Sequence, residues 1–462
     1  MKQKKNADRE SLLAYVKPSK AIVDLAVPAT LALLAKAVYN IVDTAYIGML
    51  DSDTALAAVG VTLPLLLIMV SIENIFAAGA GVLAGRQLGE GKKEEANRTV
   101  TTIVGFSVVV GIGLCISGIL FQEQLLRIFG ASDAVLPQAK EYAFWMFIAA
   151  LFNLPAQSMN CTARAESSVK ISSIAVVTGA VLNIVLDPVF MFSWGLNMGV
   201  EGASLATTIS QSVTFLILLV FYLGGFSVLK ISPRYFKLTG RFLWDVVSIG
   251  IPTAVIQICL AAATSLTNIA AKDLPDSDLI IAAYGVVQRL ILIGCYVVMG
   301  FMQGYQPVAS YAFGAKNKER FNQSAKFAVK GSLLLTVAVV GIYIVCARPL
   351  ILLFNKNPLV VEYGKWLLIS QVVLYPAFGL CYMMTITYQT IGASGMGLFL
   401  SLARQCIFYI PFILTLPGKA GVRGIYFSQP AADVLTLLLC VALIKPMKRQ
   451  IQRNMEKGTC RQ

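Results

Sequence analysis

The 462-residue chain is 57% hydrophobic and only 13% charged, with a net charge of +14 and no histidine. A soluble protein carries about 25% charged residues, so this composition excludes a soluble globular protein and an intrinsically disordered chain. The lipid bilayer is the natural solvent for such a sequence. The Lys and Arg residues form short clusters between apolar runs instead of one basic domain, which argues against nucleic-acid binding.

The composition also disfavours an enzyme. Without histidine the chain lacks the commonest general base and metal ligand. None of the nine cysteines forms a CxxC pair, and the sequence contains no nucleotide-binding or hydrolase motif. The polar N-terminus leads into a long apolar segment without a small-residue cleavage site, so no cleavable signal peptide is expected. We therefore predict a membrane protein that is not an enzyme and needs no cofactor.

A membrane-spanning helix needs about 20 mostly apolar residues. Twelve segments meet this requirement, which predicts an all-α integral membrane protein with twelve transmembrane helices. In chain order the predicted spans are 19–47, 55–84, 99–121, 140–161, 170–192, 203–225, 243–270, 279–304, 325–346, 360–388, 394–416 and 424–445.

The two halves of the chain resemble each other in sequence. Residues 199–202, Gly-Val-Glu-Gly, return at 421–424 as Gly-Val-Arg-Gly, and the polar loop that starts at Leu88 returns at Phe313. Matching positions lie 222 to 225 residues apart, which indicates an internal repeat. Each repeat holds an even number of spans, so both begin on the same side of the membrane. This predicts two parallel six-helix repeats, an N-lobe and a C-lobe.

The repeat divides the chain into five segments. They are a cytoplasmic N-tail (1–18), the N-lobe with a cation site (19–225), a cytoplasmic linker (226–241), the C-lobe (242–447) and a cytoplasmic C-tail (448–462). The membrane side that holds the tails and the linker collects 26 Lys and Arg residues, against 8 on the other side. Because basic loops stay in the cytoplasm, we predict a multi-pass protein of the cytoplasmic membrane with both termini inside.

Ionisable residues within the spans are functional candidates, because a charge at bilayer depth costs about 2.5–3.5 kcal/mol or more. Asp43 lies in the first span, and Asn183 and Asp187 share one face of the fifth. Pro188 deprives the Ile184 carbonyl of its helical hydrogen bond, which adds an oxygen near Asp187. Such hard oxygen ligands suit a proton or a sodium ion. The alternatives are helix capping by Asp187 and a solvated Asp43 at the outer mouth.

Four more charged residues within the spans are candidates for a specific role. Lys36 and Glu73 are deep in the first two spans, where they form either a structural ion pair or contacts to a substrate. Arg289 and Arg404 are expected to anchor contacts between helices. The predicted substrate cavity involves Lys36, Tyr39, Glu73, Gln257, Arg289, Tyr296, Gln303 and Tyr382.

The repeat also predicts a difference between the lobes. The offset places Thr267 opposite Asp43, and the residues from Tyr409 to Pro411 opposite Asp187. No acid occupies a C-lobe position equivalent to an N-lobe acid, so we expect buried acids and ion coupling in the N-lobe alone, facing a mostly apolar C-lobe wall.

Several short motifs resemble those of the multidrug and toxic compound extrusion (MATE) family. They are Asn40-Ile41-Val42-Asp43-Thr44, Leu182-Asn183-Ile184-Val185-Leu186-Asp187-Pro188, Gly202-Ala203-Ser204-Leu205-Ala206-Thr207, Gln306-Pro307 and Ser401-Leu402-Ala403-Arg404-Gln405. The resemblance covers nearly the whole chain and implies twelve helices in two lobes around a V-shaped cavity. It also implies a cation site formed by Asp43, Asn183, Asp187 and Thr207, with Asp43 and Asp187 as metal ligands if the ion is sodium.

The same resemblance implies a secondary active exporter. Such a protein antiports H⁺ or Na⁺ against amphipathic or cationic organic compounds, including drugs, toxins and metabolites, by alternating access. We expect a monomer whose partners are a small-molecule substrate and the lipid bilayer, with no nucleic acid. The alternatives are a flippase or dedicated exporter of a specific lipid-linked or secondary metabolite in the same superfamily, another twelve-span carrier, or a passive channel. A flippase should show a large cation-lined cavity, and the few basic residues within the spans favour the exporter.

Overall fold

The computed structural model describes residues 11–50, 53–272 and 274–457, so parts of the predicted N-tail and C-tail, 1–10 and 458–462, lie outside the described residues. The described chain is almost entirely helical and contains no β-strand. This class follows from the composition, because a chain in hydrocarbon must satisfy its backbone polar groups within its own helices. The predicted all-α fold is therefore confirmed.

The helices fall into two sets in chain order. We call α2 to α8 the N-half and α9 to α17 the C-half. The N-half contains α2 (Pro18–Gly48), α3 (Asp53–Gly89), α4 (Lys93–Leu120), α5 (Gln122–Ile128), α6 (Leu136–Ala165), α7 (Val169–Met191) and α8 (Val200–Leu223). The short η1 (Pro233–Tyr235) follows in the connection. The C-half contains α9 (Gly240–Lys272), α10 (Ser277–Gly314), α11 (Lys318–Val345), α12 (Ala347–Leu352), α13 (Pro358–Val372), α14 (Pro376–Thr390), α15 (Ser394–Leu402), the π-helical η2 (Ala403–Tyr409), α16 (Ile410–Ala420) and α17 (Val422–Lys457).

All twelve predicted spans fall on these helices. Within the described chain, ten helices are long and apolar enough to cross a membrane. Helices α13 and α14 meet at a bend of 45° and together give an eleventh candidate. The predicted span 140–161 lies in α6, which has 30 residues but is too polar to meet the same requirement. The polar residues of α6 are explained by their position, because several of them line the cavity described below.

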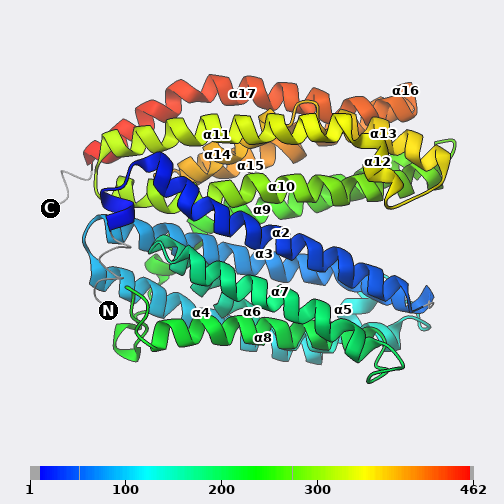
Figure 1. The fold of residues 1–462 in the computed structure, drawn as a ribbon, viewed down its shortest axis with the longest axis horizontal. Helices are drawn as coiled ribbons and strands as arrows, with labels where there is room; N and C mark the ends of the chain where they lie inside the picture. Colours follow the sequence, from blue (N-terminus) through cyan, green and yellow to red (C-terminus); the bar gives the residue numbers. More distant parts are fainter. Residues whose placement is uncertain (1–10, 51–52, 273, 458–462) are drawn as a thin grey trace.

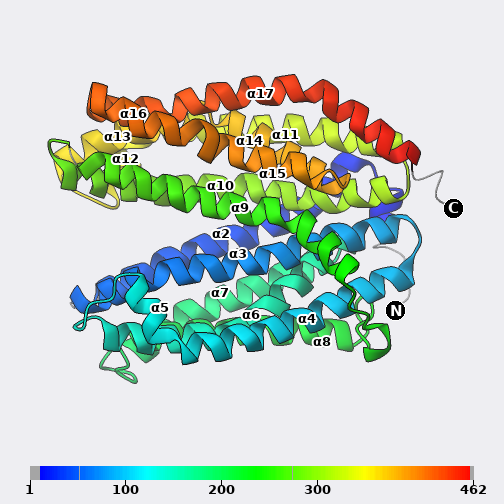
Figure 2. The same cartoon turned by 180° about the vertical axis from the view of Figure 1, so that it is seen from behind.

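The N-half and the C-half form two groups of roughly parallel helices, visible from both sides in Figures 1 and 2. Helix α2 packs on α10, and α3 packs on α9, so these four helices join the two groups. The start of α2 and the end of α17 lie at the same end of the molecule. The domain boundaries derived from the sequence remain predictions.

The internal repeat is visible in the backbone of the two Gly-Val-x-Gly segments. Gly199, just before α8, has φ 58° and ψ −131°, and Gly421, just before α17, has φ 57° and ψ −137°. A residue that carries a side chain rarely adopts these backbone angles, so glycine is required at both positions. Gly202 and Gly424 also match, because a Cβ at either would collide with the backbone of the preceding helix. The two halves thus enter their sixth helices in the same way.

Glycines also allow the two halves to touch at the end of the molecule where α2 starts. A Cβ at Gly89 would collide with the Tyr311 carbonyl oxygen, and a Cβ at Gly314 would collide with that of Arg86. The Arg86 guanidinium donates to the carbonyl oxygen of Gln389 in α14 and lies 5.6 Å from the centre of the Phe313 ring. We call these contacts of Gly89, Gly314 and Arg86 the glycine seal. Outside the seal, similar close contacts between the halves occur at four further glycines, Gly79, Gly250, Gly300 and Gly304.

Candidate functional site

Three of the predicted cation-site residues meet where α7 packs on α8. The Asn183 side-chain amide donates to Asp187 Oδ1 over 3.0 Å and to Thr207 Oγ1 over 3.2 Å. Asn183 and Asp187 are one turn apart in α7, and both are buried, with exposed fractions of 2% and 0%. Asp187 lies within α7, which continues through Pro188 to Met191 and is capped by other residues. The alternative that Asp187 serves only as a helix cap is therefore wrong.

Asp43 approaches this group from α2, which packs on α7. It is half-buried, and its carboxylate is close enough to Asp187 for the two charges to interact. Its Oδ1 atom is enclosed without a hydrogen-bond partner, so Asp43 is not a freely solvated residue at the mouth of the protein. The structure thus brings all four predicted residues into one region between α2, α7 and α8. We call Asp43, Asn183, Asp187 and Thr207 the acid cluster.

The acid cluster has unused hydrogen-bond acceptors. Asp43 Oδ1, Asn183 Oδ1 and Asp187 Oδ2 are all buried without a partner among the described residues. A buried polar atom left unpaired costs about 1–3 kcal/mol, so three of them in one place indicate a site built for a ligand that donates or is positively charged. A proton can satisfy a carboxylate, and a small cation can be held by carboxylate, amide and hydroxyl oxygens together. Within the described chain, no site gathers three or more His, Cys, Asp or Glu side chains, so a transition-metal centre is not indicated there.

A polar cavity in the N-half begins beside the acid cluster. It is lined by Asn183 and Thr207 and, of the predicted substrate residues, by Lys36, Tyr39, Glu73 and Gln303. The cavity encloses about 80 Å³ of free space, which is room for several water molecules. It therefore connects the acid cluster to the predicted substrate residues through a polar environment.

Glu73 and Lys36 do not form the direct ion pair considered from the sequence. Glu73 is buried, and its Oε1 accepts a hydrogen bond from the Asn153 amide over 2.8 Å. Lys36 makes no salt bridge within 4.0 Å in the described chain, although its charge is near enough to act on Glu73. The partner of Glu73 is thus a neutral amide from α6, and both charged side chains face the cavity.

Arg164 also lines this cavity, although it lies between the predicted spans 140–161 and 170–192. Helix α6 continues to Ala165, which keeps Arg164 in the helix with only 9% of its surface exposed. Its guanidinium donates to the side-chain oxygen of Asn160, which also accepts from Ser172, and to the Cys161 sulfur over 2.7 Å. The missed signal is the polar stretch of α6 that begins at Asn153 and continues through Asn160 to Arg164 at the end of the helix.

The remaining predicted substrate residues lie in the other half. Gln257, Tyr296 and Tyr382 line a second pocket, the C-half pocket, between α9, α10, α14 and η2. Arg289 lines neither pocket, because its side chain is exposed on α10. The predicted substrate cavity is therefore divided between two separate spaces in this conformation.

The expectation that buried acids are confined to the N-lobe is wrong. Asp433 in α17 is buried in the C-half, with 1% of its side chain exposed, and its Oδ1 lies 2.8 Å from Nε of Arg404. Gln429 donates to the same oxygen over 3.0 Å. The predicted role of Arg404 as an anchor between helices is confirmed, because this ion pair joins η2 to α17. The sequence does carry a signal for it, because Asp433 lies in the middle of the predicted span 424–445.

Comparison with known proteins agrees with this architecture. The MatE family model matches residues 28–189 and 252–415, one segment in each half of the chain. The multidrug export protein MepA of *Staphylococcus haemolyticus* (strain JCSC1435) is 23% identical over 432 residues, which cover 94% of both chains. MepA of *Staphylococcus aureus* (strain MRSA252) is 26% identical over 430 residues, covering 92% of this chain and 93% of the relative.

Solved structures show the same fold. One is described as the outward-facing conformation of a multidrug resistance MATE family transporter of the MOP superfamily. It has a TM-score of 0.90 at 23% identity and covers 96% of this chain and 98% of its own. A MATE structure in complex with MaL6 has a TM-score of 0.88 at 24% identity and covers 95% of this chain and 99% of its own.

Proposed function

Because this chain belongs to the MATE family of multidrug export transporters, we propose that it exports amphipathic or cationic organic compounds in exchange for protons or sodium ions. In this proposal the acid cluster binds the coupling ion, and the compound moves outward by alternating access. The observation that carries it is the set of unpartnered oxygens on Asp43, Asn183 and Asp187, from two helices of the N-half.

The proposed mechanism uses the position of the acid cluster between helices. Asp43 belongs to α2, whereas Asn183 and Asp187 belong to α7, so an ion bound by both sides draws the two helices together. Without the ion, two ionised carboxylates repel each other or recruit water. The ion can drive transport because it binds the closed arrangement better than the open one. Pro28 in α2 and Pro188 in α7 weaken the helical hydrogen bonds where such bending would occur.

The glycine seal supports a two-state cycle in this proposal. The backbones of the two halves touch at one end of the molecule, where no side chain can enter between them. Such contacts are lost in full when the halves separate, because packing contacts fall off steeply with distance.

We propose that the end of the molecule with the glycine seal faces the cytoplasm, as the distribution of basic residues predicts. A reporter that is active only in the cytoplasm should then be active when it is fused after Lys448. A reporter that is active only outside the cytoplasm should be inactive at the same position, and its activity would contradict the topology.

Transport by reconstituted protein tests the coupling. Purified protein in vesicles should export a cationic dye when an inward gradient of H⁺ or of Na⁺ is imposed separately, and the gradient that works identifies the ion. Asp43→Asn and Asp187→Asn should each abolish gradient-driven export. Thr267→Val, at the equivalent C-half position, is the matched control and should keep it. Export that continues at normal rates in either Asn variant would contradict the proposal.

The flippase alternative predicts a large cavity lined with cations. Lys36 and Arg164 do line the N-half cavity, but Glu73 lies there as well, and the free space is small. The balance of charges in this cavity thus favours export of drug-like compounds over transfer of a large anionic headgroup.

A further inference from the structure

The C-half pocket has a chemistry different from that of the N-half cavity. Its walls are mostly apolar and aromatic, and its lining contains one basic residue, Arg404, and no Asp or Glu. The N-half cavity is instead lined largely by polar side chains and includes Glu73. Of these two spaces, the N-half cavity offers an acid to an organic cation and the C-half pocket does not.

Arg404 is held so that it faces the pocket. Its Nε and Nη2 atoms donate to the two carboxylate oxygens of Asp433 over 2.8 and 3.4 Å. The arginine side chain is 12% exposed and the aspartate 1%, so the positive member of the pair is on the accessible side. The guanidinium also lies 5.1 Å from the centre of the Phe378 ring. No other hydrogen bond of Arg404 is found among the described residues, which leaves the Nη1 hydrogens available to an acceptor.

The backbone around Arg404 supports this orientation. Residues from Ala403 to Tyr409 form the π-helix η2 in the middle of a membrane-spanning segment. A π-helical turn shifts the faces of a helix and occurs frequently at functional sites. It places Arg404 and the neighbouring Gln405 on the same pocket. The side-chain oxygens of Gln405 and Thr385, both in the pocket lining, are buried without a hydrogen-bond partner.

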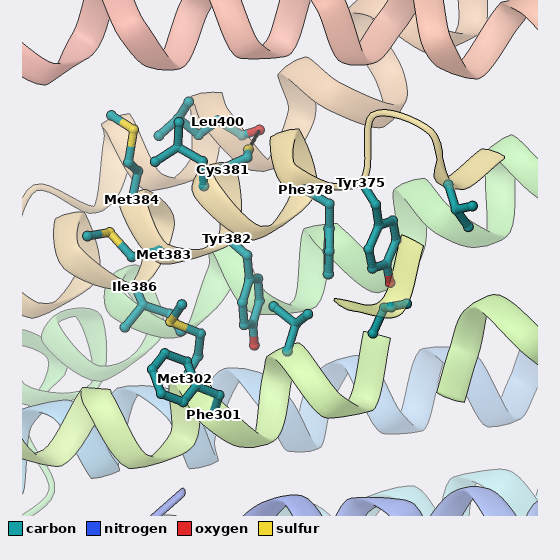
Figure 3. Packing of buried hydrophobic residues seen from close by; sticks show 14 of the residues in the cluster. Phe301, Met302, Tyr375, Phe378, Cys381, Tyr382, Met383, Met384, Ile386 and Leu400 are labelled. Atoms are coloured by element: carbon teal, nitrogen blue, oxygen red, sulfur yellow. Dashed lines mark hydrogen bonds between the residues drawn. The ribbon is translucent and has the colours of Figure 1, made fainter. Parts of the chain in front are cut away.

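Aromatic rings form the wall next to these polar groups. The Phe378 and Tyr382 rings stack with centroids 5.8 Å apart and planes inclined by 21°, and Tyr375 continues the row 5.1 Å from Phe378 (Figure 3). The edges of the rings in such a row favour a flat aromatic partner, because edge-to-face contacts add about 0.5–1.5 kcal/mol to the burial of its surface. A guanidinium edge beside them favours a carboxylate, which accepts charge-assisted hydrogen bonds from it.

We propose that the C-half pocket is a second substrate site, for planar aromatic compounds that carry a carboxylate. The aromatic part lies along Phe378 and Tyr382, and the carboxylate accepts from the free edge of Arg404. This inference rests on the proposed transport function but concerns a different substrate class from the cationic compounds of the N-half. The pocket encloses about 80 Å³ in this conformation, so a two-ring ligand must displace a flexible wall residue such as Met299.

Equilibrium binding to the full-length protein in nanodiscs tests the assignment. The probes are naphthoic acid and naphthylmethylamine, which share a ring system and differ in the sign of their charge. We expect the wild-type protein to bind the acid at least about tenfold more tightly than the amine. In the double variant Arg404→Met with Asp433→Asn, which removes both members of the ion pair together, this preference should disappear. Equal affinities in the wild type, or a preference that survives in the double variant, would overturn the proposal.

Two further variants test whether the acid binds in the C-half pocket. Leu260→Trp fills the pocket without touching the ion pair and should weaken binding of the acid by about tenfold or more. Unchanged binding in this variant would place the acid elsewhere and overturn the proposal. Gly341→Ala should leave binding of the acid unchanged, because Gly341 does not line the pocket and a Cβ there has nothing within 4 Å. If gradient-driven export survives in Asp43→Asn while the wild type still prefers the acid, the coupling proposal fails and the substrate site stands.

Discussion

The two halves of this transporter place different chemistry at equivalent positions of one repeated scaffold. In the C-half, Thr267 and Tyr409 share a buried hydrogen bond of 2.7 Å between their hydroxyl groups. The equivalent N-half residues are Asp43 and Asp187, two carboxylates that each retain an unpartnered oxygen. The same two helices of the repeat thus meet through a satisfied neutral bond in one half and through an unsatisfied acidic pair in the other. A satisfied bond holds its helices in one arrangement, whereas an unsatisfied pair responds to an added ion.

Two cations that line the two spaces, Arg404 and Lys36, differ in the same way. Arg404 has a full ion pair with Asp433 in the C-half, whereas Lys36 in the N-half has no salt-bridge partner within the described chain. A charge that already has a partner contributes mainly to structure and to the sign of its pocket. Charges without a close partner in a polar cavity remain available to substrate and ion. This difference supports the two proposals, that the N-half couples transport to the ion and that the C-half pocket is a fixed recognition surface.

The largest effect is expected from removing the acids of the N-half. Asp43→Asn or Asp187→Asn should reduce ion-driven export to background, because the neutral amide no longer changes charge when the ion binds. Thermal unfolding in detergent should change little, since an amide is similar in size and satisfies its surroundings without a cation. Transport against a gradient in vesicles is the measurement. Export by either variant at the wild-type rate would remove the functional distinction between the halves.

The second largest effect is expected from breaking the ion pair of the C-half. Asp433→Asn alone leaves Arg404 charged and without its carboxylate, which typically costs about 3–5 kcal/mol of unfolding free energy. Combining it with Arg404→Met should restore most of that loss, because no uncompensated charge remains. Denaturation of the single and double variants measures this coupling. Equal losses in the two proteins would show that the pair does not act as a unit.

A smaller effect is expected at the glycine seal. Gly314→Ala introduces a methyl group against the Arg86 backbone and should destabilise the sealed arrangement by about 1–3 kcal/mol. Gly341→Ala is the matched control, because a Cβ at that position of α11 has nothing within 4 Å. Spin-label distances across the sealed end should lengthen in the first variant and remain unchanged in the second. A distance distribution like the wild type's in Gly314→Ala would mean that the seal is not a determinant of conformation.

The smallest effect is expected between Lys36 and Glu73. The sequence suggested that these residues are coupled, and the structure gives Glu73 an amide partner instead of a close cation. A double-mutant cycle with Lys36→Met and Glu73→Gln should therefore give an interaction energy of about 0.5–1 kcal/mol, the low end for neighbouring charges. Unfolding of the four proteins in the same detergent provides the value. A coupling of several kcal/mol would indicate a direct pair in another conformation of the cycle.

Much of the acid cluster could be predicted from residues close together in the chain. Asn183 and Asp187 are four residues apart, so a helix must place them on one face whatever surrounds it. The addition of Asp43 and Thr207 depended on the family resemblance, because helical periodicity does not tell which helices are neighbours. The structure brings these residues together through the packing of α2 and α8 on α7. The partner of Glu73 could not be predicted for the same reason, since Asn153 is 80 residues away.

The sequence by itself determined the membrane class, the twelve spans and the repeat, because hydrophobicity, helix length and periodicity are local properties of the chain. The tertiary structure alone decided that Arg164 faces a cavity, that Asp433 is buried against Arg404, and that the predicted substrate residues divide between two pockets. Each of these depends on which helix lies opposite. In a chain where most helices are apolar on every side, the amphipathic pattern that would orient a helix toward its neighbour is weak, so only the packed structure assigns the partners.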